Sequence, residues 1–398
     1  MPHVNPDAVL PLTLLLVFGS AKLLSEICER FKQPGIVGEI AAGILIGPSV
    51  LHWIEPVEFL TVLAELGVMF LLFRVGLEIK ASELMRVGGT AMIVAVLGVI
   101  TPFAAGWALS LLFGYPQIEA IFIGASMVAT SVGITAQVLA SLGYLHARAS
   151  QIILAAAVID DVLGLIVLAI VSSVAKGSFN VTELVLTGAI AIAFTVVVAH
   201  WGTRAMKRIV PKVEVALSVS EAQFAMAICL LFGLSVMAVF AGVAAIIGAF
   251  LAGMALSETI NKRVIDLTNG VTELLVPFFL VGIGLHFNLA AFSNTSTLLF
   301  AVVILVAAIA TKLVGCGLGA IQLGKADALR IGTGMMPRGE VGMVVAQLGL
   351  AMSIVSEAVF GVVVFMSVAT TVLAPPLLAV VYRGVPSRKV EPTQTRIG

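Results

Sequence analysis

Residues 152–171 read IILAAAVIDDVLGLIVLAIV, an apolar run with two neighbouring carboxylates, Asp160 and Asp161, near its centre. The run is long enough to cross a bilayer as a helix, which takes about 20 residues. One ionised carboxylate in the middle of a membrane helix costs about 2.5–3.5 kcal/mol on insertion scales. Because an apolar side chain would serve packing better, the pair indicates an ion or proton pathway.

The composition indicates an integral membrane protein. Apolar residues make up 60% of the 398 residues and charged residues only 11%, whereas soluble proteins carry about 25% charged residues. Successive apolar runs predict an all-α membrane protein with about thirteen transmembrane helices. The predicted spans are 9–27, 36–52, 58–77, 89–113, 118–142, 150–174, 182–202, 217–237, 240–257, 266–286, 295–320, 331–352 and 357–382.

The basic residues orient these spans, since Lys and Arg favour the cytoplasmic side of a membrane. With the N-terminus outside, the cytoplasmic loops and tail carry seventeen of the 22 basic residues, and the outer loops carry Lys176 alone. The N-terminus has no basic region followed by a cleavage site, so no signal peptide is expected. These features favour a bacterial inner (plasma) membrane, with the C-terminus in the cytoplasm.

The two halves of the chain resemble each other at an offset of about 209 residues. The matching segments are 36–43 (IVGEIAAG) with 246–253 (IIGAFLAG), and 65–77 (ELGVMFLLFRVGL) with 273–285 (ELLVPFFLVGIGL). A shift by seven spans, an odd number, turns the second six-helix copy upside down. Inverted repeats are typical of secondary transporters. The small residues Gly43, Gly248 and Gly253 are expected to allow close helix packing.

Both copies contain a span that we expect to be broken. Span five includes residues 129–133 (ATSVG), and its partner in span twelve includes residues 336–342 (MPRGEVG). Pro337 removes a backbone donor and disfavours helical geometry at Met336. Interrupted helices at matching places in two inverted halves point to a transport site, where unwound carbonyl groups can bind a cation.

The charged residues inside the spans predict the chemistry of that site. Neighbouring helical residues point about 100° apart, so Asp160 and Asp161 face different partners. Lys312, deep in another span, is expected to pair with one of them, because an unpaired buried ammonium is costly. The three charges sum to −1, and hard oxygen ligands suit one alkali cation, for which protons can compete. The alternative is a structural Asp–Lys pair with a second aspartate that has no role.

Arg338 and Glu340 flank the break in span twelve. We expect them to compensate each other, Glu65 or Glu78, and the exposed helix ends, as structural support rather than as transport residues. Arg74 is one turn before Glu78 and is expected to pair with it or to extend its charged end to the membrane interface.

These segments resemble the monovalent cation:proton antiporter superfamily, in its second branch, and the NapA-like sodium/proton antiporters in particular. The motifs that carry the resemblance are 37–43 (VGEIAAG), 76–78 (GLE), 128–135 (VATSVGIT), 157–165 (AVIDDVLGL), Lys312 and 337–342 (PRGEVG).

The resemblance implies that Asp161 is the principal cation- and proton-binding residue and that Asp160 forms a salt bridge with Lys312. It implies that Thr130 and Ser131 line the cation site. An Asp-Asp pair with such a lysine is associated with electrogenic exchange. The family mechanism is an elevator-like movement of a core domain against the dimerisation domain of a homodimer.

The domain limits follow from this resemblance. We expect the dimerisation domain in 1–88 and 217–290, the core transport domain in 89–174 and 291–382, a linker helix in 175–216, and a short basic cytoplasmic tail in 383–398.

The predicted function is secondary active exchange of Na+ or Li+ for H+, with no cofactor beyond the transported ions and no nucleic acid partner. The first alternative is K+/H+ exchange at the same site, as in the Kef-like branch. A passive cation channel is a weaker alternative, because channels need no inverted broken helices. An enzyme is not expected, since the spans contain no metal-ligand cluster and no nucleophile with a base.

Overall fold

The computed structural model describes residues 6–31, 33–80, 86–176, 181–216, 221–287 and 294–386. The described part is helical and contains no β-strand, as the apolar runs predict. Helices suit a lipid environment because each one satisfies its own backbone hydrogen bonds. Residues 387–398, most of the predicted tail, lie outside the described residues.

Within the described part, nine helices are long and apolar enough to cross a membrane. They are α1 (Pro6–Arg30), α3 (Glu58–Glu78), α5 (Gly88–Leu112), α8 (Arg148–Lys176), α9 (Val181–Ala216), α10 (Ala222–Phe240), α12 (Lys262–Leu285), α13 (Thr295–Gly319) and α16 (Glu357–Val381).

Shorter helices occupy the segments between these nine. They are α2 (Gly35–Ile46), α6 (Gln117–Ser126), α7 (Val132–Ser141), α11 (Ala245–Leu256), α14 (Lys325–Gly334), α15 (Glu340–Ala351) and the 3-10 turn η2 (Ile321–Leu323). Pairs α6–α7 and α14–α15 correspond to the two predicted broken spans, and α2 and α11 to the two shortest predicted spans. The count of thirteen spans stays a prediction.

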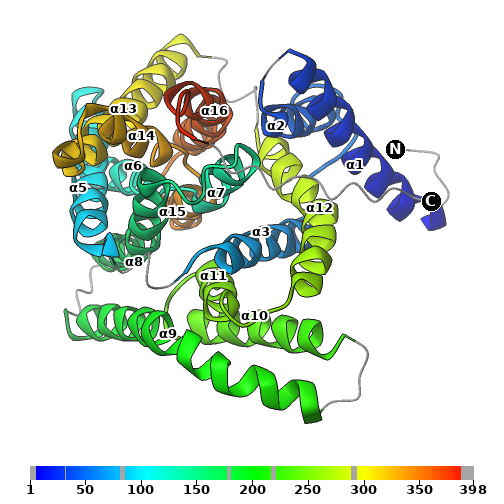
Figure 1. Cartoon of the computed structure of the whole chain (residues 1–398). Helices are drawn as coiled ribbons and strands as arrows, with labels where there is room; N and C mark the ends of the chain where they lie inside the picture. Colours follow the sequence, from blue (N-terminus) through cyan, green and yellow to red (C-terminus); the bar gives the residue numbers. More distant parts are fainter. Residues whose placement is uncertain are drawn as a thin grey trace.

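The helices pack in two groups (Figure 1). In the first, α1, α2, α3, α10, α11 and α12 contact one another; in the second, α5 to α8 and α13 to α16 do so. The groups meet where α7 packs on α3 and α16 packs on α2, while α9 contacts α8, α10 and α11. The division into a dimerisation domain, a core transport domain and a linker helix stays a prediction, as does the role of each group.

Two close crossings in the first group relate the two copies of the sequence repeat. At one, Gly43 of α2 lies against Gly284 of α12; at the other, Gly253 of α11 lies against Gly76 of α3. A Cβ atom at Gly43 would collide with the carbonyl oxygen of Val281, and one at Gly253 with that of Phe73. Each crossing is the repeat image of the other, so glycine is needed at equivalent places in both copies. We call these two contacts the glycine crossings.

Candidate functional site

Both predicted helix breaks are present in the second group. The first separates α6 from α7 at residues 127–131, and the second separates α14 from α15 at residues 335–339. The second break contains Pro337, as the sequence predicts. The first has no proline, and it ends where Ser131 takes up an extended conformation before α7 begins.

The two breaks cross each other, and hydrogen bonds join them. The Ser131 backbone N–H donates to Pro337 O (2.9 Å), Thr130 Oγ1 to Met335 O (3.2 Å) and Thr135 Oγ1 to Gly334 O (2.7 Å). Hydroxyl and amide donors of one broken helix therefore satisfy the carbonyl groups that the other broken helix leaves unpaired. Gly339 permits the contact, since a Cβ atom there would lie 2.7 Å from the Ser131 side chain. We call this contact the broken-helix crossing.

Asp160 of α8 lies at this crossing with both carboxylate oxygens engaged. Lys312 Nζ of α13 donates to Oδ1 at 3.1 Å, and the Thr130 backbone N–H donates to Oδ2 at 2.8 Å. Asp160 is 1% exposed and Lys312 is fully buried. The expected Asp–Lys pair is thus present, and charge-assisted hydrogen bonds of this kind are strong.

Asp161 follows on the same helix and is half-buried, which makes it the more accessible of the two carboxylates. The adjacent break supplies the Thr130 hydroxyl and the Ser131 hydroxyl. Among the described residues, Ser131 Oγ is buried and has no hydrogen-bond partner. Carboxylate, hydroxyl and unwound carbonyl oxygens are the ligands that hard alkali cations prefer. This donor set could hold a transported cation beside Asp161.

Lys312 reaches Asp160 across the surface of α5. A Cβ atom at Gly98 would lie 2.7 Å from Cys316 Sγ and 3.3 Å from Lys312 Nζ. Glycine at position 98 therefore leaves the room that the lysine side chain occupies.

Arg338, within the second break, is fully buried. Its Nη2 donates to Ala308 O at 3.3 Å, and its backbone N–H donates to Thr370 Oγ1 at 3.1 Å. The Thr371 hydroxyl donates to the Arg338 carbonyl oxygen at 2.8 Å. Among the described residues, Nε and Nη1 have no hydrogen-bond partner. The guanidinium also interacts electrostatically with Asp160 and Lys312.

The predicted partners of Arg338 are corrected in part. Glu65 is exposed on α3, and Glu78 pairs with Arg74 at 3.9 Å, as expected for that i, i+4 spacing. Neither neutralises Arg338. The side chain of Glu340 lies outside the described residues.

The buried Arg338 guanidinium adds one positive charge beside the three charges that the sequence count of −1 includes. Asp160, Asp161, Lys312 and Arg338 sum to zero. If Arg338 and Glu340 neutralise each other, as the sequence predicts, the remaining three charges sum to −1.

Several residues that shape the site had no predicted role. Thr135 joins the two broken helices, Thr370 and Thr371 hold the backbone of Arg338, and Gly98 admits Lys312. The threonines share one signal, a hydroxyl inside an apolar span, where polar groups tend to find partners on other helices. Gly98 has no comparable signal, because glycine is frequent in membrane helices.

The comparisons with known proteins agree with this architecture. The family described as "Sodium/hydrogen exchanger, transmembrane" matches residues 14–383. The Na(+)/H(+)-K(+) antiporter GerN of Bacillus cereus is 35% identical over 371 residues, covering 92% of this chain and 94% of that protein. The high-affinity Na(+)/H(+) antiporter NhaS3 of Synechocystis is 35% identical over 423 residues, covering 94% and 90%.

A solved structure supports the fold. The sodium proton antiporter MjNhaP1 from Methanocaldococcus jannaschii matches with a TM-score of 0.66, covering 92% of this chain and 95% of that one. The two sequences are 18% identical, so this likeness concerns the arrangement of helices alone.

Proposed function

The chain belongs to the sodium/hydrogen exchanger family, and from this premise we propose that it exchanges Na+ for H+ across a membrane. It is an integral membrane transporter rather than an enzyme. We further propose that Li+ can replace Na+, that the exchange is electrogenic, and that the chain works as a homodimer in a bacterial inner membrane. Its N-terminus would face outward.

The observation that carries this proposal is the position of Asp160 and Asp161 at the broken-helix crossing. Asp160 is held on both oxygens by Lys312 and Thr130, whereas Asp161 is more accessible. We therefore assign the transported cation to Asp161, with Thr130 and Ser131 as further oxygen ligands. A proton and a cation cannot occupy the same carboxylate, so their competition couples the two fluxes.

The lysine supplies a route to electrogenic exchange. A cation that also attracts Asp160 weakens the pair with Lys312. A buried ammonium that loses its partner is costly, which favours release of a proton from Lys312. Two protons, one from Asp161 and one from Lys312, would then leave for each cation that binds.

The decisive experiment measures cation-dependent proton efflux from proteoliposomes. We expect Asp161→Asn to reduce exchange to the background of empty liposomes while the thermal unfolding temperature of the purified protein stays close to that of the wild type. Normal exchange by this variant would remove Asp161 from the cation site. Efflux that is unaffected when valinomycin and K+ clamp the membrane potential would contradict electrogenic exchange.

K+/H+ exchange is the second candidate, because the relative GerN is named as a Na(+)/H(+)-K(+) antiporter. Sodium, lithium and potassium are compared in the same liposomes, with choline as the control cation. Proton efflux driven by K+ alone would replace the sodium proposal with the potassium one. Cation flux without a response to an imposed pH gradient would indicate a channel.

We also propose that the second helix group moves against the first in an elevator-like cycle. The groups meet at Gly133 of α7, where a Cβ atom would lie 2.9 Å from Val68 Cγ2 of α3. That proximity suits a disulfide. In a background without Cys28, Cys229 and Cys316, oxidation of Val68→Cys/Gly133→Cys should stop exchange and reduction should restore it. Each single variant serves as a control, and undiminished exchange by the oxidised pair would contradict the movement.

A further inference from the structure

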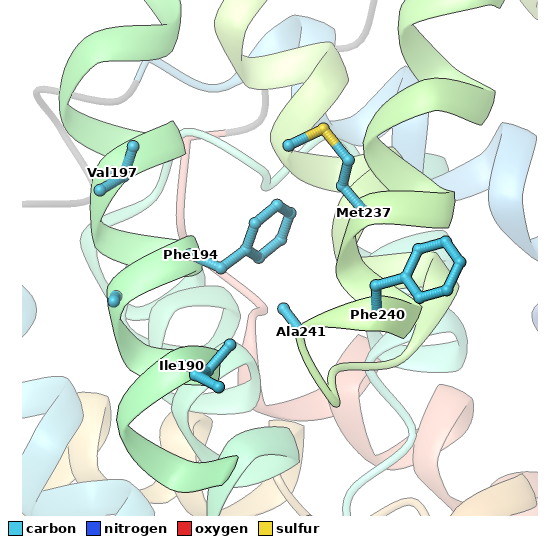
Figure 2. Close-up of a pocket in the computed structure, with 7 residues that line it drawn as sticks. Ile190, Phe194, Val197, Met237, Phe240 and Ala241 are labelled. Atoms are coloured by element: carbon cyan, nitrogen blue, oxygen red, sulfur yellow. The ribbon is translucent and has the colours of Figure 1, made fainter. Parts of the chain in front are cut away.

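An apolar groove lies between α9 and the end of α10, away from the broken-helix crossing. It has a volume of about 470 Å³ and is lined by Ile190, Ala193, Phe194, Val197, Met237, Phe240 and Ala241. In Figure 2 Phe194 points from α9 into the space between the two helices, and Met237 reaches toward that space from α10.

The groove is open to the surroundings of the protein. Ile190 is 45% exposed, Val197 49%, Met237 54% and Phe240 86%. Every lining side chain is apolar, and α9 here belongs to a segment, Gly188–Val210, that could span a membrane. A hydrocarbon occupant suits such a lining, whereas a polar ligand would find no partner.

The face of α9 that lines the groove leads, about two to three turns further along the helix, to basic residues. Ile190, Phe194 and Val197 are followed, at spacings of four and three residues, by Trp201, Arg204 and Arg208. At 100° per residue, these six side chains leave the helix within about 40° of one direction. Trp201, Arg204 and Arg208 are exposed. The helix face therefore carries first apolar residues, then an aromatic residue and then basic residues. This order matches the acyl chains, the membrane interface and the headgroups of a lipid layer.

The two arginines are available for an anionic partner. Their neighbour Lys207 pairs with Glu258 at 2.7 Å. Among the described residues, neither Arg204 nor Arg208 takes part in a salt bridge or a side-chain hydrogen bond. Arg forks suit phosphate oxygens, which they bind through two parallel hydrogen bonds.

The dimensions also agree with a phospholipid. Ten residues separate Phe194 from Arg204, which is about 15 Å along an α-helix. The hydrocarbon core of a bilayer is about 30 Å thick, so one leaflet provides about 15 Å. An acyl chain that starts near Arg204 therefore ends beside Phe194 and Met237.

We propose that this groove binds an anionic phospholipid, with one acyl chain between α9 and α10 and the phosphate group on Arg204 and Arg208. The site is distinct from the proposed cation site. It joins α9, which contacts α8 of the second group, to α10 of the first.

The test is native mass spectrometry of the full chain released from detergent, with phosphatidylglycerol and phosphatidylcholine of identical acyl chains. The wild type should retain phosphatidylglycerol preferentially. Arg204→Gln/Arg208→Gln should lower its affinity for phosphatidylglycerol about 30-fold, because each basic residue near the headgroup contributes roughly fivefold. The charge-matched control Lys325→Gln/Arg383→Gln, at the start of α14 and just after α16, changes two exposed basic residues of the second helix group and should leave that affinity unchanged.

A second variant separates a groove from a charged surface. Ala193→Trp fills the groove and should remove retention of phosphatidylglycerol although both arginines remain. Ile192→Trp should not, because Ile192 points about 100° away from Ala193 on α9 and is 54% exposed without lining the groove. Retention that survives Ala193→Trp would show general attraction to basic residues and overturn the proposal. Equal retention of the two lipids by the wild type would do the same. Conversion of a dimer to a monomer by Ala193→Trp, with lipid retention unchanged, would instead assign the groove to a second copy of the chain.

Discussion

The glycine crossings and the broken-helix crossing bring the two sequence repeats into contact in two different ways. At the glycine crossings, backbones touch without intervening side chains, and the two contacts are repeat images of each other. At the broken-helix crossing, the contact is polar and unequal. One copy supplies the donors, from Thr130, Ser131 and Thr135. The other supplies the acceptors, which are the carbonyl oxygens of Met335, Pro337 and Gly334.

The difference separates packing from chemistry. Close backbone contact gives dispersion contacts and leaves no space for an ion. Unwound backbone exposes carbonyl groups and places hydroxyls and carboxylates beside them, at the cost of regular helix hydrogen bonds. The symmetric contacts therefore suit a rigid framework, and the asymmetric one suits a binding site.

The largest effect should come from the polar crossing. Lys312→Met removes the partner of Asp160 and leaves a buried carboxylate uncompensated, so the free energy of unfolding should fall by about 3–5 kcal/mol. Unfolding in mixed micelles measures this change. The double variant Asp160→Asn/Lys312→Met should recover most of the loss, since it removes both charges. A stability of the single variant equal to that of the wild type would mean that the pair does not hold α8 to α13.

An intermediate effect is expected at the glycine crossings. Gly253→Val introduces a side chain where backbone lies, and overpacking of this kind destabilises proteins by about 1–3 kcal/mol. Gly43→Val should cost the same amount, because its surroundings are the repeat image. Gly233→Val on α10 is the control, as a Cβ atom there meets nothing within 4 Å. Clearly unequal losses in the free energy of unfolding for Gly43→Val and Gly253→Val would contradict the equivalence of the two crossings.

The smallest effect on stability should follow from Ser131→Ala. The hydroxyl has no hydrogen-bond partner among the described residues, so the free energy of unfolding should change by less than about 0.5 kcal/mol. The apparent KM for Na+ should nevertheless rise several-fold, because the cation loses an oxygen ligand. An unchanged KM in the proteoliposome assay would remove Ser131 from the cation site.

The sequence predicted the helical fold, the repeat, both breaks and a pair between Lys312 and one of the two aspartates, and the family resemblance implied that this aspartate is Asp160. These features depend on strong local signals in the sequence. A long apolar run is compatible with few structures other than a buried or membrane helix, and a proline inside such a run interrupts it. A buried ammonium needs a negatively charged partner. The surroundings of Arg338 could not be predicted, because Ala308, Thr370 and Thr371 lie on other helices. Glu65 was expected as a partner, but it lies exposed on the surface of α3. Contacts between distant segments depend on how each helix is rotated about its own axis. In a span that is apolar on every side, the periodicity of the sequence does not define this rotation.

The glycine crossings also limit how the molecule can deform. Where Gly43 meets Gly284 and Gly76 meets Gly253, the helices interlock through backbone atoms, and sliding either pair would drive a carbonyl group into its neighbour. Rotation about the contact point is then the one low-energy movement left to each pair of helices. Larger displacements must be taken up elsewhere in the chain, in the connections that lead away from these four residues.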